Sequence, residues 1–164
     1  MKKEKDRDFL ICLILLGIMV IVVSYPFFAT QITPSNHGDL LFHLNRIEGI
    51  KDGLLAGQFP VRIHAYQLDG YGYPVGIFYP DLFLYPAAFL RLLGVRIEGA
   101  YNFLCIMSNI MTVYSSWYAF SRFSRSYKIG AISAVLYTIC SYHIIEIYVR
   151  SALGEKLAMA FFPL

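Results

Sequence analysis

Asp39, His43 and Arg46 are the residues whose types and spacing could best support catalysis. They stand at positions i, i+4 and i+7, so a helix would place them along one stripe. The Asp39 carboxylate could act as a general base that takes the proton of an attacking hydroxyl group. Arg46 or His43 could offset the charge of a leaving phosphate. The pattern therefore indicates group transfer from a phosphate donor, with Asp39 catalytic and His43 and Arg46 in substrate binding.

A purely structural interpretation of this stripe stays open. Asp39 follows a glycine and precedes a stretch with apolar periodicity, which is the position of an ordinary helix N-cap. His43 and Arg46 could simply face lipid headgroups.

Arg150 and Glu155 form a second candidate group, in the stretch VRSALGE. A cation and an acid near one membrane face could bind a phosphate or orient a substrate, so both are predicted substrate-binding residues. The alternative is a helix-end arrangement, in which Glu146 and Arg150 pair at i, i+4 and Ser151 caps the next helix.

The composition places the chain in a membrane. Of its 164 residues, 57% are hydrophobic and 15% are charged, against about 45–50% and 25% in soluble domains. The net charge of +3 comes from scattered residues, so no nucleic acid partner is expected. The cysteines and histidines show no metal-ligand spacing, and no cofactor is predicted. Carboxylates could hold a divalent metal, but no pattern indicates one.

The first half of the chain predicts an anchor followed by a long external loop. Residues 1–8 form a basic tail, expected in the cytoplasm, and the apolar run 9–29 is long enough to span a bilayer. Residues 30–99 are expected outside, with amphipathic interfacial helices at 39–57 and 78–93.

The second half predicts further membrane helices. Residues 100–120 and 129–148 are expected to span, joined by the basic cytoplasmic loop 121–128, and 149–164 begins another membrane helix. If Val75–Leu93 crossed instead, the basic loop would lie outside. The predicted fold is therefore all-α and polytopic, with about three full spans and a truncated fourth, in a piece of a longer protein.

Three stretches carry a resemblance to a known family. They are GDLLFHLNRIEGIKDGLLAGQFPVRI at 38–63, GYGYPVGIFYPDLFLYPAAFLRLLGV at 70–95 and YVRSALGEKLAMAFFPL at 148–164. Together with the basic anchor, they resemble the N-terminal part of YfhO-like bacterial membrane proteins, including those described as 6-pyruvoyl-tetrahydropterin synthase-related. These proteins look like GT-C glycosyltransferases, whose first external loop carries an acid, as Asp39 would here.

The resemblance implies an enzyme in the bacterial cell membrane. It would transfer a sugar from a polyprenyl-phosphate donor to a cell-envelope acceptor, with its N-terminus in the cytoplasm. Its partners would be membrane lipids, the lipid-linked sugar and the missing C-terminal spans, without which the fragment is expected to be inactive. The zinc chemistry in the family description is not expected, because the histidines are not clustered.

A non-catalytic membrane protein, either a scaffold or a transporter fragment, is the alternative. A transporter should carry ionisable groups at mid-span, often on broken helices. The predicted spans carry almost no charge at their centres, which favours an interfacial site over a translocation path.

Overall fold

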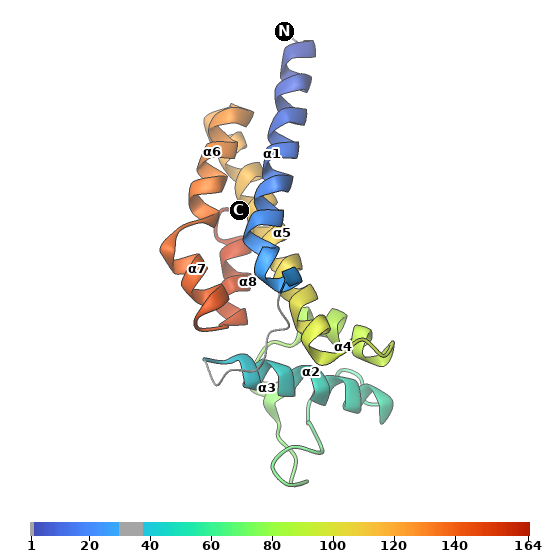
Figure 1. The fold of residues 1–164 in the computed structure, drawn as a ribbon. Helices are drawn as coiled ribbons and strands as arrows, with labels where there is room; N and C mark the ends of the chain where they lie inside the picture. Colours follow the sequence, from blue (N-terminus) through green and yellow to red (C-terminus); the bar gives the residue numbers. More distant parts are fainter. Residues whose placement is uncertain (1, 30–37) are drawn as a thin grey trace. The chain divides into compact units, whose positions relative to one another are not determined.

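The computed structural model describes residues 2–29 and 38–164, in which helices joined by loops form the structure and no strand occurs (Figure 1). The prediction of an all-α fold is confirmed. The elements are α1 Lys2–Ala29, α2 Leu40–Leu55, α3 Val75–Phe78, the 3-10 turn η1 Leu82–Leu84, α4 Tyr85–Leu92, α5 Ile97–Ser124, α6 Tyr127–Thr138, α7 Ser141–Tyr148 and α8 Leu153–Phe161. The part of the predicted external loop at 30–37 lies outside the described residues.

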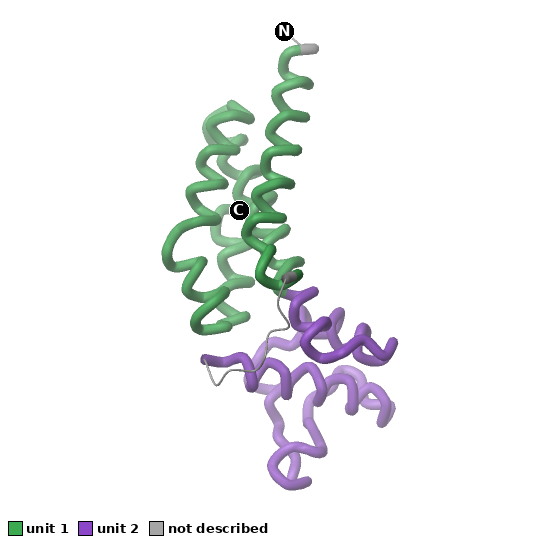
Figure 2. Tube along the Cα trace, viewed as in Figure 1, with its two compact units in different colours: residues 1–31, 105–164 green, residues 32–104 purple. Residues whose placement is uncertain are grey.

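The chain divides into two compact units (Figure 2). The bundle unit comprises residues 1–31 and 105–164, and the loop unit comprises residues 32–104. Each unit is held by its own contacts and is described by itself.

α1 contains the apolar run predicted at 9–29 and begins earlier, in the basic tail. Within residues 2–29 and 38–164, Glu4–Phe28 is the only unbroken helix that is long and apolar enough to cross a membrane. Its 25 residues rise about 38 Å, against a hydrocarbon thickness of about 30 Å. One helix near the amino terminus could therefore span a bilayer.

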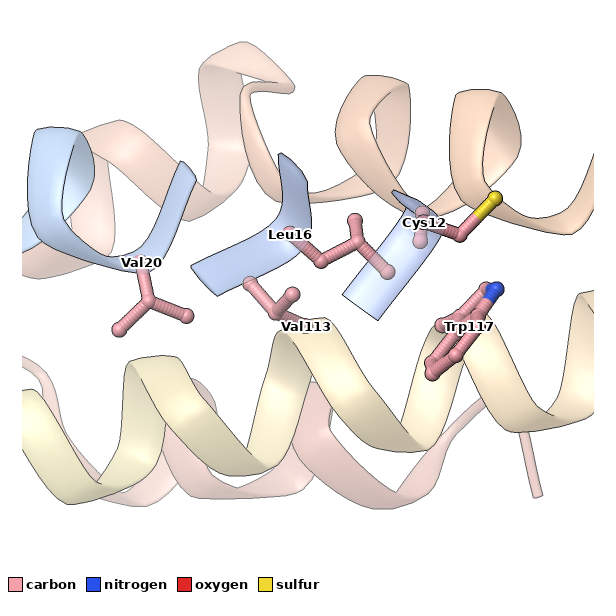
Figure 3. Packing of buried hydrophobic residues seen from close by; sticks show 6 residues of the cluster. Cys12, Leu16, Val20, Val113 and Trp117 are labelled. Atoms are coloured by element: carbon pink, nitrogen blue, oxygen red, sulfur yellow. The ribbon is translucent and has the colours of Figure 1, made fainter. Parts of the chain in front are cut away.

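The core of the bundle unit lies between α1, α5 and α6 (Figure 3). Cys12, Leu16 and Val20 recur every four residues on α1, so they share one face and pack against Val113 and Trp117 of α5. This apolar face packs α1 into the unit.

α5 contains the predicted span 100–120 in one helix of 28 residues. A polar stripe of Ser108, Asn109, Thr112 and Ser116 is buried along it. The hydroxyl groups donate to carbonyl oxygens of their own helix, and Asn109 Nδ2 donates to Ser24 Oγ at 3.0 Å. Side-chain hydrogen bonds of this kind join helices in an apolar surrounding, where other partners are scarce.

The stretch predicted as one span at 129–148 is divided into α6 and α7, which is a correction. The two helices meet at 49°, and Cys140 between them has an extended backbone with φ −58° and ψ 145°. His143 Nδ1 lies 2.7 Å from the Thr138 carbonyl oxygen, so the imidazole satisfies a carbonyl left unpaired where α6 ends. Together the two helices are apolar enough for a broken span or a re-entrant loop.

Val75–Leu93 is also divided, so the helix predicted at 78–93 is shorter than expected. Tyr79 is extended and Pro80 lacks an N–H donor, and this ends α3. The apolar helix that follows covers only Leu82–Leu92, which rises about 16 Å and falls short of a bilayer. The structure thus favours the interpretation in which this segment does not cross.

Gly130 marks the closest approach between α5 and α6, and its replacement by Ala should be destabilising. A Cβ atom there would lie 2.1 Å from Ser121 Oγ and 2.6 Å from the Ser121 backbone nitrogen, so the helices must separate. We expect Gly130→Ala to lower the free energy of unfolding by about 1–3 kcal/mol, measured by thermal unfolding in detergent.

Gly17→Ala is the matched control for this substitution. It makes the same change inside α1, where the nearest atom to a new Cβ is Tyr114 Oη at an ordinary 3.5 Å. Its stability should stay equal or rise by up to about 1 kcal/mol, because Ala favours helix more than Gly. Equal loss in the two variants would contradict the close contact at Gly130.

Candidate functional site

α2 positions the predicted catalytic stripe, and its buried face is partly polar. Leu44, Ile47 and Ile50 fall on the face that the apolar periodicity predicts, and His43 and Arg46 are buried beside them. The helix predicted at 39–57 therefore forms at Leu40–Leu55. Its buried face includes polar residues as well as the apolar ones that predicted it.

Ion pairs attach α2 to α4. Glu48 accepts a hydrogen bond from Arg91 Nε, and Lys51 Nζ lies 2.6 Å from the other carboxylate oxygen. Partial burial raises the pKa of Glu48, but the hydrogen bonds from Arg91 and Lys51 outweigh burial and hold that pKa below its ordinary value. The charged carboxylate thus joins the two helices at neutral pH.

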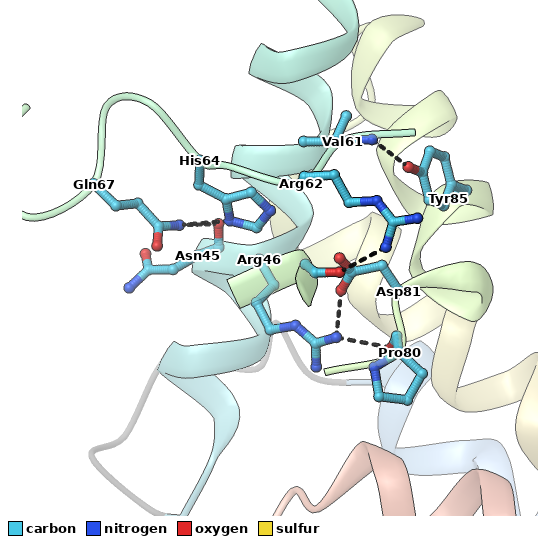
Figure 4. Close-up of polar contacts among 10 residues, drawn as sticks. Asn45, Arg46, Val61, Arg62, His64, Gln67, Pro80, Asp81 and Tyr85 are labelled. Atoms are coloured by element: carbon cyan, nitrogen blue, oxygen red, sulfur yellow. Dashed lines mark hydrogen bonds and ion pairs between the residues drawn. The ribbon is translucent and has the colours of Figure 1, made fainter. Parts of the chain in front are cut away.

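Arg46 is enclosed within the loop unit (Figure 4). Its guanidinium pairs with Asp81 Oδ1 and donates to the Pro80 carbonyl oxygen at 2.8 Å. The Phe42 and Tyr79 rings flank it at 5.4 and 5.3 Å from their centroids. The side chains of Arg46 and Asp81 are only 5% and 7% exposed. Arg46 therefore binds Asp81, and it does not lie on an open flank of the helix.

The predicted stripe is divided by burial. His43 is buried with Arg46, whereas Asp39, one turn earlier, is exposed. Asp39 occupies the N-cap position of α2, yet its side chain makes no capping hydrogen bond. The N-cap position that the structural interpretation gives Asp39 is therefore confirmed, although the capping hydrogen bond is not formed. The interpretation of His43 and Arg46 as headgroup contacts does not fit their burial.

His64 is a site residue that the sequence analysis did not select. It is buried against α2, where Gly49 exposes bare backbone: a Cβ at Gly49 would lie 2.3 Å from His64 Nδ1. Gln67 Nε2 lies 3.2 Å from that nitrogen and donates to the Asn45 carbonyl oxygen at 2.8 Å. Gly49 and Gly53 lie four residues apart in α2, and this spacing was the sequence signal that another segment approaches the helix closely there.

Burial lowers the pKa of His64, and this makes the loop unit sensitive to acid. Asp81 opposes the shift and Arg46 adds to it. The folded state binds its proton less readily than the unfolded chain, so stability is full above the ordinary pKa of about 6.5 and falls as pH drops below it. Because the intrinsic rate of amide exchange itself falls with pH, the quantity to compare is the protection factor, and we expect it to decrease at residues 61–73 between pH 7 and pH 5.5. His64→Gln should flatten this dependence, and an unchanged dependence in that variant would assign it to other groups.

A groove of about 690 Å³ lies in the loop unit beside the Arg46–Asp81 pair. Its walls are mainly apolar and aromatic, and Arg62 and Asp81 are its charged members: Phe59, Pro60, Val61, Arg62, Gly76, Ile77, Phe78, Tyr79, Pro80, Asp81, Leu82, Tyr85 and Phe89. Arg62 is exposed and donates to the Gly76 carbonyl oxygen at 3.4 Å, and the Val61 N–H donates to Tyr85 Oη at 2.9 Å. A groove with this lining suits an apolar chain that ends in an anionic group.

Arg150 and Glu155 lie close together in the bundle unit. Arg150 Nη2 lies 3.7 Å from Glu155 Oε1, and Arg150 Nη1 lies 2.6 Å from Glu146 Oε1. The helix-end pair of Glu146 and Arg150 is thus formed, and substrate binding by Arg150 and Glu155 stays a prediction. Ser151 does not cap α8, because the N-cap position is Ala152. Asp39 belongs to the other unit, so a cavity shared by Asp39 and Arg150 stays a prediction.

Charged side chains are buried around α7 and α8, where the sequence analysis expected few. Glu146 and Lys156 are each 1% exposed, and His143 is fully buried. Lys156 Nζ lies 5.1 Å from the centroid of the Phe27 ring, and Glu146 Oε2 has no hydrogen-bond partner among the described residues. In the sequence, these buried charges could have been recognised as single charged residues inside apolar runs.

Across residues 2–29 and 38–164, no group of three or more His, Cys, Asp or Glu side chains is arranged to hold a metal ion. No protein-family model, no curated protein and no solved structure matches the chain.

Proposed function

We propose that this chain is the N-terminal part of a GT-C-like membrane glycosyltransferase that transfers a sugar from a polyprenyl-phosphate donor to a cell-envelope acceptor. The exposed Asp39 carboxylate carries the proposal, because it stands at the start of α2 without making the capping bond that would account for it. An uncommitted carboxylate at the rim of a folded unit is available to accept a proton.

The reaction is an inverting displacement. The acceptor hydroxyl oxygen forms a bond to the anomeric carbon while the bond from that carbon to the phosphate oxygen breaks. Asp39 takes the hydroxyl proton, and the polyprenyl phosphate leaves with the electron pair of the broken bond. An arginine offsets the charge on the leaving phosphate. Arg62 is the exposed candidate within the loop unit, since Arg46 is committed to Asp81.

The groove of the loop unit supports a lipid-linked donor. Its apolar and aromatic walls suit isoprenoid units, and Arg62 suits the phosphate that ends such a chain. Asp81 lines the groove, and its buried pair with Arg46 joins the groove to α2, the helix that begins after Asp39.

The proposal is tested by following a radiolabelled polyprenyl-phosphate sugar in membrane vesicles that contain the full-length protein. Transfer of the label to envelope material should require the protein, and its deletion should leave the donor unconsumed. Equal consumption with and without the protein would overturn the proposal.

A membrane transporter is the second candidate, and the broken α6–α7 pair favours it. Broken helices with buried ionisable groups are typical of substrate and ion sites in transporters. Glu146 and Lys156 provide such groups beside the break. Solute uptake that is lost in Glu146→Gln, in a protein without transferase activity, would support the transporter over the enzyme.

A further inference from the structure

A pocket of about 670 Å³ lies in the bundle unit, where α1, the end of α5 and the start of α6 meet. Its lining combines cations with aromatic rings and includes no Asp or Glu among the described residues. All of its residues belong to the bundle unit and none takes part in the proposed transfer. Lys5, Arg122 and Arg125 supply three positive charges to this one pocket.

The aromatic walls orient two of these cations. Lys5 Nζ lies 5.9 Å from the centroid of the Tyr127 ring, and the Arg122 guanidinium lies 5.5 Å from that of Tyr118. A guanidinium that stacks on a ring keeps its N–H donors at its edge, where a phosphate oxygen can accept them.

Among the described residues, the three pocket cations have no acidic partner within ion-pair distance. Lys5, Arg122 and Arg125 form no ion pair with Asp or Glu in the described part of the chain, and Asp8 pairs instead with Lys128 at 2.8 Å. Such a cluster repels itself, which an anion in the pocket would relieve.

The backbone at the end of α5 adds a cation to the pocket lining. Arg125 follows the last residue of α5 with φ +55°, a position where glycine is preferred. An arginine held there places a cation at the mouth of the pocket despite its backbone cost.

We propose that this pocket binds the phosphate group of an anionic phospholipid. The pocket lies along α1, the helix that could span the membrane, and at its basic end, so a lipid headgroup can reach it. Basic pockets between membrane helices are a common setting for anionic headgroups. The phosphate accepts hydrogen bonds from Arg122 and Arg125, and the aromatic rings contact the glycerol and upper acyl chain.

The chain offers a direct probe, because Trp117 is its single tryptophan and lines the pocket. Its indole N–H donates to the Tyr127 carbonyl oxygen at 3.2 Å, and its ring stacks on Phe9 at 5.2 Å between centroids. The fluorophore is therefore held in place, and its quenching reports on this pocket.

The experiment titrates the purified 164-residue chain, in a non-ionic detergent, with phosphatidylglycerol that is brominated near the top of its acyl chains. We expect saturable quenching of Trp117 that unlabelled phosphatidylglycerol reverses. Phosphatidylcholine and inorganic phosphate at the same concentrations should not reverse it. Competition by phosphatidylcholine would overturn a site for anionic lipid, and equal competition by inorganic phosphate would show a free-anion site in place of a lipid site.

Two double variants of equal net charge complete the test. Arg122→Gln with Arg125→Gln removes two pocket cations, and the apparent affinity for phosphatidylglycerol should fall at least tenfold. Arg7→Gln with Lys128→Gln removes two cations outside the pocket lining and should change it less than threefold. An equal loss of affinity in the two double variants would show that only the net charge of the chain matters, and would overturn the site. The competition series on the unaltered chain decides the question even where a variant does not fold.

Discussion

Replacement of Asp39 by Asn is expected to lower sugar transfer by the full-length protein about 10²–10⁴-fold while leaving its level in the membrane unchanged. The amide keeps the size of the side chain but cannot take the acceptor proton. Because Asn caps helices as well as Asp, the stability of α2 should not change. The measurement is transfer of a labelled sugar from a polyprenyl-phosphate donor in membrane vesicles.

Asp69→Asn is the control for this prediction. Asp69 is also exposed in the loop unit, and its φ of +55° is one that Asn tolerates, so the same chemical change is made away from α2. Its transfer activity should stay within threefold of the unaltered protein. Activity within a few-fold in Asp39→Asn as well would remove Asp39 as the catalytic base.

Replacement of Arg46 by Met is expected to destabilise the loop unit by about 3–5 kcal/mol. The substitution leaves the Asp81 carboxylate buried without its cation, in surroundings that disfavour a lone charge. Arg46→Met with Asp81→Leu should regain most of the stability, because neither charge then remains. Hydrogen exchange at residues 38–104 in detergent measures the loss and its recovery.

Arg91→Met provides the comparison within the same unit. It breaks the partly exposed pair with Glu48, where water screens the remaining charge, so we expect a loss of at most about 1 kcal/mol. If Arg46→Met cost no more than Arg91→Met, the Arg46–Asp81 pair would be a surface interaction and would not support the groove.

Local pattern was sufficient to predict α1 and α2. The apolar run at 9–29 is too long for a globular helix, and the apolar residues of 39–57 recur at the helical period, so both helices follow from neighbours in the chain. The position of Asp39 at the start of a helix and the proximity of Arg150 to Glu155 could also be predicted from the sequence, because each depends on residues at a single helix end.

The break between α6 and α7 within 129–148 could not be predicted from local pattern. The residues are apolar on both sides of the break, and mean hydropathy does not distinguish one straight helix from two bent ones. The bend depends on the imidazole of His143 taking the Thr138 carbonyl, a contact that hydrophobic periodicity does not describe.

The sequence by itself determined that the chain is helical, rich in apolar runs and equipped with an acid at the start of α2. Only the tertiary structure decided which charges are available. Arg46 meets an acid 35 residues away, and Glu146 and Lys156 become buried between α7 and α8 and their neighbours. A charge in a helical pattern has the same sequence signature whether it faces solvent or a distant partner, because burial depends on which segments pack together.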